Sequence, residues 1–182
     1  MAGCYSADLH SSSGAPILLL DNLRSAFNVG SAFRVAEAIS PCHVFLTGCC
    51  ARPGGRKLAH TARGTQNTVL WKYFESSADA AAWISGTGRR LVVLEPLPEA
   101  IPIFEAPFGI SDAFIFGNEA LGVSSGVLAA ADMRVYMPQT GTRGCMNVAG
   151  AIAATAMEIQ RRRLLLGLPM PPPVRLPWDE ET

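Results

Sequence analysis

The sequence predicts an α/β fold in which a mostly parallel sheet is covered by helices on both faces. Apolar runs of about four to six residues alternate with helical stretches from residue 17 to residue 163. Such continuous runs are typical of parallel strands that are buried on both faces. The 182 residues, of which 49% are hydrophobic and 16% are charged, suit one domain with a substantial core.

The first elements expected along the chain are a strand, a helix and a second strand. Residues 17–20 (ILLL) form a continuous apolar run, and residues 28–39 repeat apolar side chains at helical spacing. Residues 42–48 (CHVFLTG) are again mostly apolar and of strand length. The polar residues 49–75 that follow predict an irregular connection.

The rest of the chain continues this alternation. A serine at the start of SSADAAAWI is a favourable helix cap, and LVVLEP, DAFIFGN and MRVYMP have the composition of buried strands. The remaining expected elements are helix 76–84, strand 91–96, strand 112–118, helix 124–132, strand 133–138 and helix 147–163.

We expect one folded domain, residues 17–166, between two short terminal segments. Residues 1–16 lack both the cationic start and the apolar stretch of a signal peptide, and they predict a flexible leader. Residues 167–182 predict an extended tail, because five prolines fall within 169–177. No segment approaches the ~20 apolar residues that a membrane span requires.

Several common kinds of site are excluded by missing patterns. The five cysteines lack the paired spacing of a zinc site, so we expect reduced thiols, no metal and a cytoplasmic location. The sequence has no GxGxxG after the first strand and no GxxxxGK[ST], which excludes nicotinamide Rossmann enzymes and P-loop NTPases. A thiol nucleophile at Cys145 would need a histidine at a neighbouring strand end, and the pattern offers none.

The charges balance overall, with 15 Lys and Arg against 15 Asp and Glu, but they are unevenly placed. Between Glu37 and Glu75 there are basic residues and no acidic residue. Such a segment is suited to follow a phosphate backbone, and the alternative is a solvated loop. The basic residues of this segment are Arg52, Arg56, Lys57, Arg63 and Lys72.

Ligands of a parallel α/β sheet bind at the carboxyl ends of the strands. Three segments follow expected strands with glycine and polar residues, namely DNLRSAFNVGSAFR, FGNEALGVSSG and MPQTGTRGCMN. In the first, Asn28 is a substrate contact or a helix cap, and Arg34 is a phosphate clamp or the partner of Glu37 at i+3. In the second, Glu119 is a base, a hydrogen-bond acceptor for a ligand or the ion-pair partner of an arginine.

Taken together and in this order, these segments resemble the motifs of the SpoU/TrmH family of RNA ribose 2′-O-methyltransferases. NVGSAFRVAEA (28–38) resembles the first motif, FIFGNEALGVSS (114–125) the second, and YMPQTGTRGCMNVAGAIAATAMEI (136–159) the third. KLAHTARGT (57–65), followed by WKYF (71–74), is similar to the linking segment of compact members. The resemblance covers essentially the whole expected domain.

The resemblance implies a C-terminal trefoil knot, a homodimer, and S-adenosylmethionine held in the knot largely by backbone groups. It implies in-line methyl transfer to a ribose 2′-hydroxyl of tRNA or rRNA, without a DNA or membrane partner. The implied catalytic residues are Asn28, Arg34, Glu119 and Asn147. The implied cofactor-binding residues are Gly117, Asn118, Gly122, Met137, Gly141, Cys145 and Met146. The candidate RNA-binding residues are Arg24, Arg52, Arg56, Lys57, Arg63 and Arg143.

Among these residues, the resemblance assigns Arg34 to the ribose and to its neighbouring phosphate. A guanidinium stays protonated in proteins, so we expect Arg34 to position the substrate and neutralise charge rather than to abstract the proton.

Two features depart from the family pattern. Cys145 stands where members usually have serine, and a thiol is the weaker hydrogen-bonding group, so a contact there is looser. No separate RNA-binding domain precedes the first strand, so we expect the catalytic domain to bind RNA through residues 52–72. Two other functions stay open. One is a non-catalytic RNA-binding or assembly protein of the same fold, and the other is a base or small-molecule methyltransferase in which Arg34→Ala spares activity.

Overall fold

The computed structural model describes residues 14–142 and 144–170, and the pairings between its named strands are all parallel. The seven-stranded sheet has the order β3-β2-β1-β6-β4-β7-β5. Its strands are β1 (Ile17–Leu20), β2 (His43–Thr47), β3 (Trp71–Phe74), β4 (Leu91–Leu94), β5 (Ile101–Pro102), β6 (Ala113–Phe116) and β7 (Met133–Tyr136). The helices are α1 (Ala26–Ala38), α2 (Arg56–Ala62), the 3₁₀ turn η1 (Thr65–Asn67), α3 (Ser77–Ser85), α4 (Ser125–Ala130) and α5 (Val148–Leu165).

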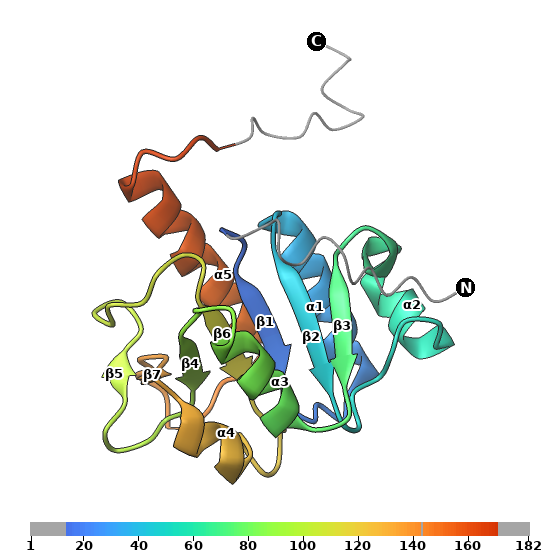
Figure 1. Cartoon of the computed structure of the whole chain (residues 1–182), viewed down its shortest axis with the longest axis horizontal. Helices are drawn as coiled ribbons and strands as arrows, with labels where there is room; N and C mark the ends of the chain where they lie inside the picture. Colours follow the sequence, from blue (N-terminus) through green and yellow to red (C-terminus); the bar gives the residue numbers. More distant parts are fainter. Residues whose placement is uncertain (1–13, 143, 171–182) are drawn as a thin grey trace.

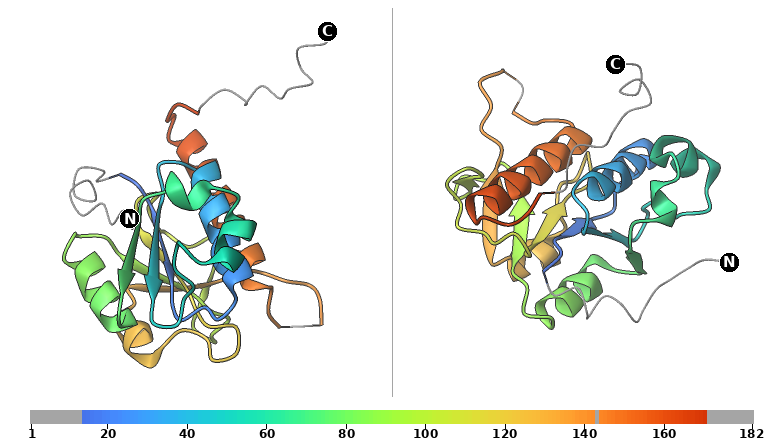
Figure 2. Two further views of the ribbon diagram at one scale, coloured as in Figure 1. Left: turned by 90° about the vertical axis from the view of Figure 1, so that its right-hand side faces the viewer. Right: turned by 90° about the horizontal axis from the view of Figure 1, so that it is seen from above.

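Helices cover both faces of the sheet. α1, α2 and α5 lie against one face, and α3 and α4 lie against the other (Figures 1 and 2). Leu18 and Leu20 of β1 belong to the core on the α1 side, whereas Ile17 and Leu19 belong to the core on the α3 side. Because successive side chains of a strand point to opposite faces, one apolar run fills both cores. The predicted α/β class is confirmed.

The expected strands and helices are present, with shifted ends. α1 begins earlier than expected, and its cap is Ser25, whose hydroxyl accepts a hydrogen bond from the backbone N–H of Asn28 (3.4 Å). The interpretation of Asn28 as the helix cap is therefore wrong. α5 is capped by Asn147, whose Oδ1 accepts from the N–H of Ala149 (2.9 Å).

The connection 49–75 is not irregular, because it holds α2, η1 and β3. β3 is an edge strand, and all of its residues are half-buried. The guanidinium of Arg52 lies 3.3 Å from the ring centroid of Tyr73, and the Lys72 Nζ lies 4.4 Å from that of Trp83. An edge strand with cationic and aromatic side chains lacks the continuous apolar run that marks a buried strand. β5, with two residues, is too short for any such pattern.

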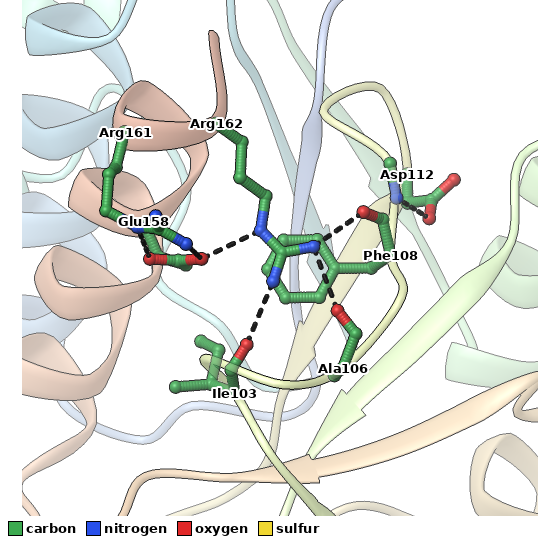
Figure 3. Close-up of polar contacts among 8 residues, drawn as sticks. Ile103, Ala106, Phe108, Asp112, Glu158, Arg161 and Arg162 are labelled. Carbon is green, nitrogen blue, oxygen red and sulfur yellow. Dashed lines mark hydrogen bonds and ion pairs between the residues drawn. The ribbon is translucent and has the colours of Figure 1, made fainter. Parts of the chain in front are cut away.

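Arg162 fastens α5 to the segment between β5 and β6 (Figure 3). Its guanidinium donates hydrogen bonds to the carbonyls of Ile103 (3.1 Å), Ala106 (2.9 Å) and Phe108 (2.8 Å). The same group pairs with Glu158 (2.8 Å) and lies 3.6 Å from the ring centroid of Phe108. The planar guanidinium, which carries five N–H donors, thus joins two parts of the chain that are far apart in sequence.

The neighbouring arginines of α5 also bind within the fold. Arg161 pairs with Glu158 at 2.7 Å, and Arg163 donates to the carbonyls of Ile39 (3.0 Å) and Pro41 (3.3 Å). The last turns of α5 therefore contact both the α1–β2 corner and the β5–β6 segment.

The expected leader and tail lie largely outside the described residues. Among residues 14–142 and 144–170, no helix is long and apolar enough to cross a membrane. The same residues contain no cluster of three or more His, Cys, Asp or Glu side chains that is arranged to hold a metal ion.

Candidate active site

A cavity of about 420 Å³ lies at the carboxyl ends of β4, β6 and β7. It is bounded by the residues that follow each of these strands and by the first turn of α5. This is the edge of the sheet where a parallel fold is expected to bind ligands. The lining residues are Leu94, Glu95, Pro96, Phe116, Gly117, Asn118, Glu119, Ala120, Gly122, Tyr136, Met137, Gln139, Gly144, Cys145, Met146, Asn147, Val148 and Ala151.

A tight turn after β6 forms one wall of this cavity. Asn118 and Gly122 exchange backbone hydrogen bonds (3.0 and 2.9 Å), and Gly122 has a φ of 71°. A Cβ on Gly117 would lie 2.3 Å from the carbonyl carbon of Gly122, so glycine is required there. The Asn118 side chain holds the turn, because its Oδ1 accepts from the N–H of Ala120 (2.9 Å) and its Nδ2 donates to the carbonyl of Asn22 (2.7 Å).

Glu119 lines the same cavity and is hydrogen-bonded to the start of α1. Its Oε1 accepts from the Nδ2 of Asn28 (2.7 Å), and its Oε2 accepts from the backbone N–H of Arg24 (3.2 Å). Burial raises the pKa of the Glu119 carboxyl, but the hydrogen bonds from Asn28 and from backbone N–H groups outweigh burial and hold the pKa below its usual value. The carboxylate is therefore ionised at neutral pH.

Asp21, the residue after β1, holds several strand-end segments together. Its side chain is buried, and its Oδ2 accepts from the N–H of Ser124 (2.7 Å). Its Oδ1 accepts from the Nδ2 of Asn22 (2.8 Å) and from the hydroxyl of Ser77. A buried carboxylate needs such partners, and these bonds fix the end of β1 against the starts of α3 and α4.

Residues 15–157 match the model of the SpoU rRNA Methylase family. The chain belongs to this family. The matched range contains the first two motif-like segments and almost all of the third, so the resemblance seen in the sequence is confirmed.

Named relatives agree with this SpoU assignment, and one solved structure shares the fold. The tRNA (guanosine(18)-2'-O)-methyltransferase of Escherichia coli K12 is 26% identical over 164 residues, which are 89% of this chain and 70% of that protein. The 23S rRNA (guanosine(2553)-2'-O)-methyltransferase of Bacillus subtilis is 27% identical over 87% of this chain, and the chain spans 63% of that protein. The SpoU methyltransferase AviRb from Streptomyces viridochromogenes, in complex with the cofactor AdoMet, has the same fold. Its TM-score is 0.79 at 21% identity, over 91% of this chain and 67% of that one.

The SpoU residues expected to bind the cofactor mostly border the cavity. Gly141 is exposed and is not part of the lining. Arg143, which is expected to bind RNA, lies outside the described residues. The expected cofactor residues that do line the cavity are Gly117, Asn118, Gly122, Met137, Cys145 and Met146.

The structure places three of the four expected SpoU catalytic residues at one site. Asn28 bonds to Glu119, and Glu119 lines the cavity together with Asn147. Arg34 is exposed on α1, and within the described part of the chain it forms no hydrogen bond or ion pair. The alternative interpretation of Arg34 as the partner of Glu37 is therefore wrong. Among the described residues, the partners of Glu119 are an amide and backbone N–H groups, and no arginine of this part of the chain forms an ion pair with it.

Glu95 is a site residue that the sequence analysis missed. It follows β4 and lines the cavity, and its Oε1 accepts from the N–H of Val123 (2.6 Å). A Cβ on Gly122 would lie 2.7 Å from the same oxygen, so the carboxylate packs directly against the turn. A carboxylate directly after the apolar run LVVL was the available signal, because the rule on strand ends applies to this strand as well.

His43 lies at the amino end of β2, at the edge of the sheet opposite the cavity. Burial and then the charge of Arg89 lower the pKa of His43 to about 4. His43 is therefore remote from Cys145, which lines the cavity.

The expected RNA-binding residues occupy different surroundings. Arg24, Arg56 and Lys57 line a second cavity, of about 720 Å³, between the start of α1 and α2. Arg52 is stacked on an aromatic ring of β3, and Arg63 ends α2 in the left-handed conformation with a φ of 54°.

Proposed function

We propose that this SpoU family member transfers a methyl group from S-adenosylmethionine to the 2′-hydroxyl of a ribose in tRNA or rRNA. One observation carries the proposal. The ionised carboxylate of Glu119, held by Asn28 of the first motif, lines a cavity whose walls are the second and third motifs. The relatives in Escherichia coli and Bacillus subtilis, by their names, methylate the ribose of a guanosine in tRNA and in 23S rRNA.

The cavity fits the cofactor in size and chemistry. A volume of about 420 Å³ is within the range that small-molecule ligands occupy, and the walls combine methionine side chains with main-chain groups of the glycine turn. When bound, S-adenosylmethionine supplies a methyl group on a sulfonium centre. The residues that would hold it are Gly117, Gly122, Met137, Cys145 and Met146.

The residues of the chain orient the substrate and neutralise the charge of its phosphate. Asn28 fixes the Glu119 carboxylate, which accepts a hydrogen bond from the substrate and, with its lowered pKa, is a weak base. The Nδ2 of Asn147 has no partner among the described residues and is available as a donor to the substrate. Arg34 binds the phosphate beside the target ribose and neutralises its charge. Alignment of hydroxyl and methyl group for in-line attack supplies much of the rate.

We also propose the trefoil knot, supported by the topology of the last strands. β6 and β7 lie on either side of β4, and Arg162 of α5 binds three carbonyls of the segment between β5 and β6. A chain end that passes through this segment would form these contacts.

The proposal includes a homodimer and a cytoplasmic location. Apolar side chains remain exposed along the second half of α5, where a second copy would cover them. These side chains are Met157, Leu164, Leu165 and Leu166.

Calorimetry with S-adenosylmethionine, followed by transfer of labelled methyl groups to total tRNA and rRNA, tests the proposal. We expect binding, transfer to one RNA fraction, and label on the ribose 2′-oxygen after nuclease digestion. Label on a base would favour base methylation instead. Binding without transfer to any RNA, or no binding of the cofactor, would favour a non-catalytic RNA-binding protein.

A further inference from the structure

The second cavity combines an exposed aromatic ring with fixed positive charge. Phe27, the second residue of α1, is 63% exposed and lines this cavity of about 720 Å³. Arg24, Arg56, Lys57 and His60 line it as well, and no acidic side chain is part of the lining. An apolar ring left in water beside cations is the usual arrangement of a surface that stacks bases and holds phosphates.

The second cavity adjoins the candidate active site through the backbone. The N–H of Arg24 donates to the Oε2 of Glu119 at 3.2 Å, so one residue belongs to both places. A chain of nucleotides that reaches Glu119 from this side therefore passes Phe27.

We propose that Phe27 stacks on a nucleobase of single-stranded RNA next to the target nucleotide, while Arg24, Arg56 and Lys57 hold its phosphates. This inference rests on the proposed function, because it takes RNA as the substrate. A second copy of the chain fits the second cavity less well than RNA does. A twofold contact centred here would place the three cations of one copy against those of the other, and like charges in contact oppose association.

The test measures binding of a fluorescent 12-residue oligouridylate over a series of salt concentrations. Stacking on an aromatic side chain is neutral, whereas each phosphate contact releases counterions. Phe27→Ala is therefore expected to weaken binding roughly tenfold at every salt concentration without changing the salt slope. Phe27→Trp keeps the affinity. The double variant Arg56→Gln with Lys57→Gln makes the dependence of affinity on salt less steep, by the amount that about one to two phosphate contacts contribute.

Phe104 provides the matched control, because it is 62% exposed, lies between β5 and β6, and is not part of this cavity. Phe104→Ala should bind the oligonucleotide as the wild type does. For the RNA fraction that accepts methyl groups, we expect the KM to rise in Phe27→Ala and to stay unchanged in Phe104→Ala. The affinity for S-adenosylmethionine should be the same in both variants.

Two results would overturn the inference. One is wild-type RNA affinity and KM in Phe27→Ala, and the other is a change from dimer to monomer in this variant, measured by sedimentation, which would assign Phe27 to an interface between copies. If the wild type methylates RNA and Phe27→Ala matches it, only the stacking site fails. If the wild type methylates no RNA, the proposed function fails as well.

Discussion

Asn28 influences the ionisation of the Glu119 carboxyl, which lines the candidate active site. Replacement of Asn28 by alanine is expected to raise the pKa of Glu119, because the 2.7 Å hydrogen bond that lowers the pKa is lost. Titration of the carboxyl carbon by NMR measures the shift. Asn67→Ala, at an exposed position in η1, is the control.

The same bond has a consequence for acid stability. The pKa of Glu119 in the folded protein lies below the usual 4.5. The ionised carboxylate therefore contributes its full share to the free energy of unfolding above the unfolded pKa, and this contribution is lost as the pH falls through the folded pKa. The free energy of unfolding of the wild type should therefore fall more steeply than that of Asn28→Ala below about pH 4.5. Identical pH profiles would contradict this account.

Arg34 is expected to act only when RNA is present, because it has no hydrogen bond or ion pair among the described residues of the free protein. Arg34→Ala should lower methyl transfer by roughly two orders of magnitude or more, while the affinity for S-adenosylmethionine stays the same. Single-turnover transfer and calorimetry measure the two quantities. Glu37→Ala, on the same helix and also exposed, should leave both unchanged. Full activity of Arg34→Ala would indicate a base or small-molecule substrate.

At the scale of residues, the sequence predicted the segments of the site better than its individual contacts. The strand-end rule and the resemblance named Asn28 and Glu119, but the hydrogen bond between them joins residues that are far apart in sequence, and no local pattern reveals it. Glu95 was missed because the segment after LVVL has no glycine and belongs to none of the three motif-like segments. No arginine of the described residues pairs with Glu119, and its backbone N–H partners could not be predicted, because every residue type except proline carries such a group.

At the scale of elements, the turn after β6 depends on glycine. Gly117→Ala is expected to force the backbone of Gly122 outward, since the new Cβ would lie 2.3 Å from it, and so to weaken cofactor binding tenfold or more. Calorimetry with S-adenosylmethionine measures the loss. Gly126→Ala in α4, where a Cβ meets nothing within 4 Å, should keep the affinity and slightly stabilise the helix.

Arg162 attaches α5 to the segment between β5 and β6, and the contribution of its contacts to the free energy of unfolding can be measured. Arg162→Ala removes one of the two arginines that pair with the buried Glu158 and takes away the donor to three carbonyls, which we expect to cost about 3 kcal/mol. Urea unfolding followed by circular dichroism gives this value. Arg161→Ala is the matched control, because Arg161 is more exposed and Arg162 still pairs with Glu158 in that variant. Equal losses in the two variants would refute the special role of Arg162.

Elements were predictable where the chain has a run of mostly apolar residues, including β7, which is only partly buried. The strands β1, β2, β4, β6 and β7 contain apolar runs that periodicity finds. β3 and β5 lie at the two edges of the sheet, where one side faces solvent and the run is short or mixed. α2 escaped prediction because its seven residues, RKLAHTA, are mostly polar and bury only Leu58 and Ala62.

At the scale of the whole molecule, the exposed apolar surface of α5 predicts self-association. Sedimentation equilibrium is expected to give a mass of twice 19.3 kDa. Leu165→Glu, at a position that is 72% exposed, should yield monomers of unchanged fold. Leu121→Glu, 86% exposed in the turn after β6, is the control and should stay dimeric. A monomeric wild type would reject the dimer.

The layers of the fold follow from composition and periodicity, but the strand order does not. Placing β6 and β7 on either side of β4 brings distant segments together, and such crossings leave no trace in local spacing. Only the resemblance to SpoU proteins led to the expectation of a knot and a dimer, and only the family match confirmed the resemblance.

The late position of α5 in the sequence affects how the protein is made. Val148 and Ala151 of this helix form part of the cavity wall, and its last turns bind the α1–β2 corner and the β5–β6 segment. A nascent chain that ends before α5 contains all seven strands, yet it has neither a closed cavity nor these two attachments. Competence to bind a cofactor therefore arises only after α5 has been synthesised, and chains that stop before this helix cannot compete with finished protein for S-adenosylmethionine.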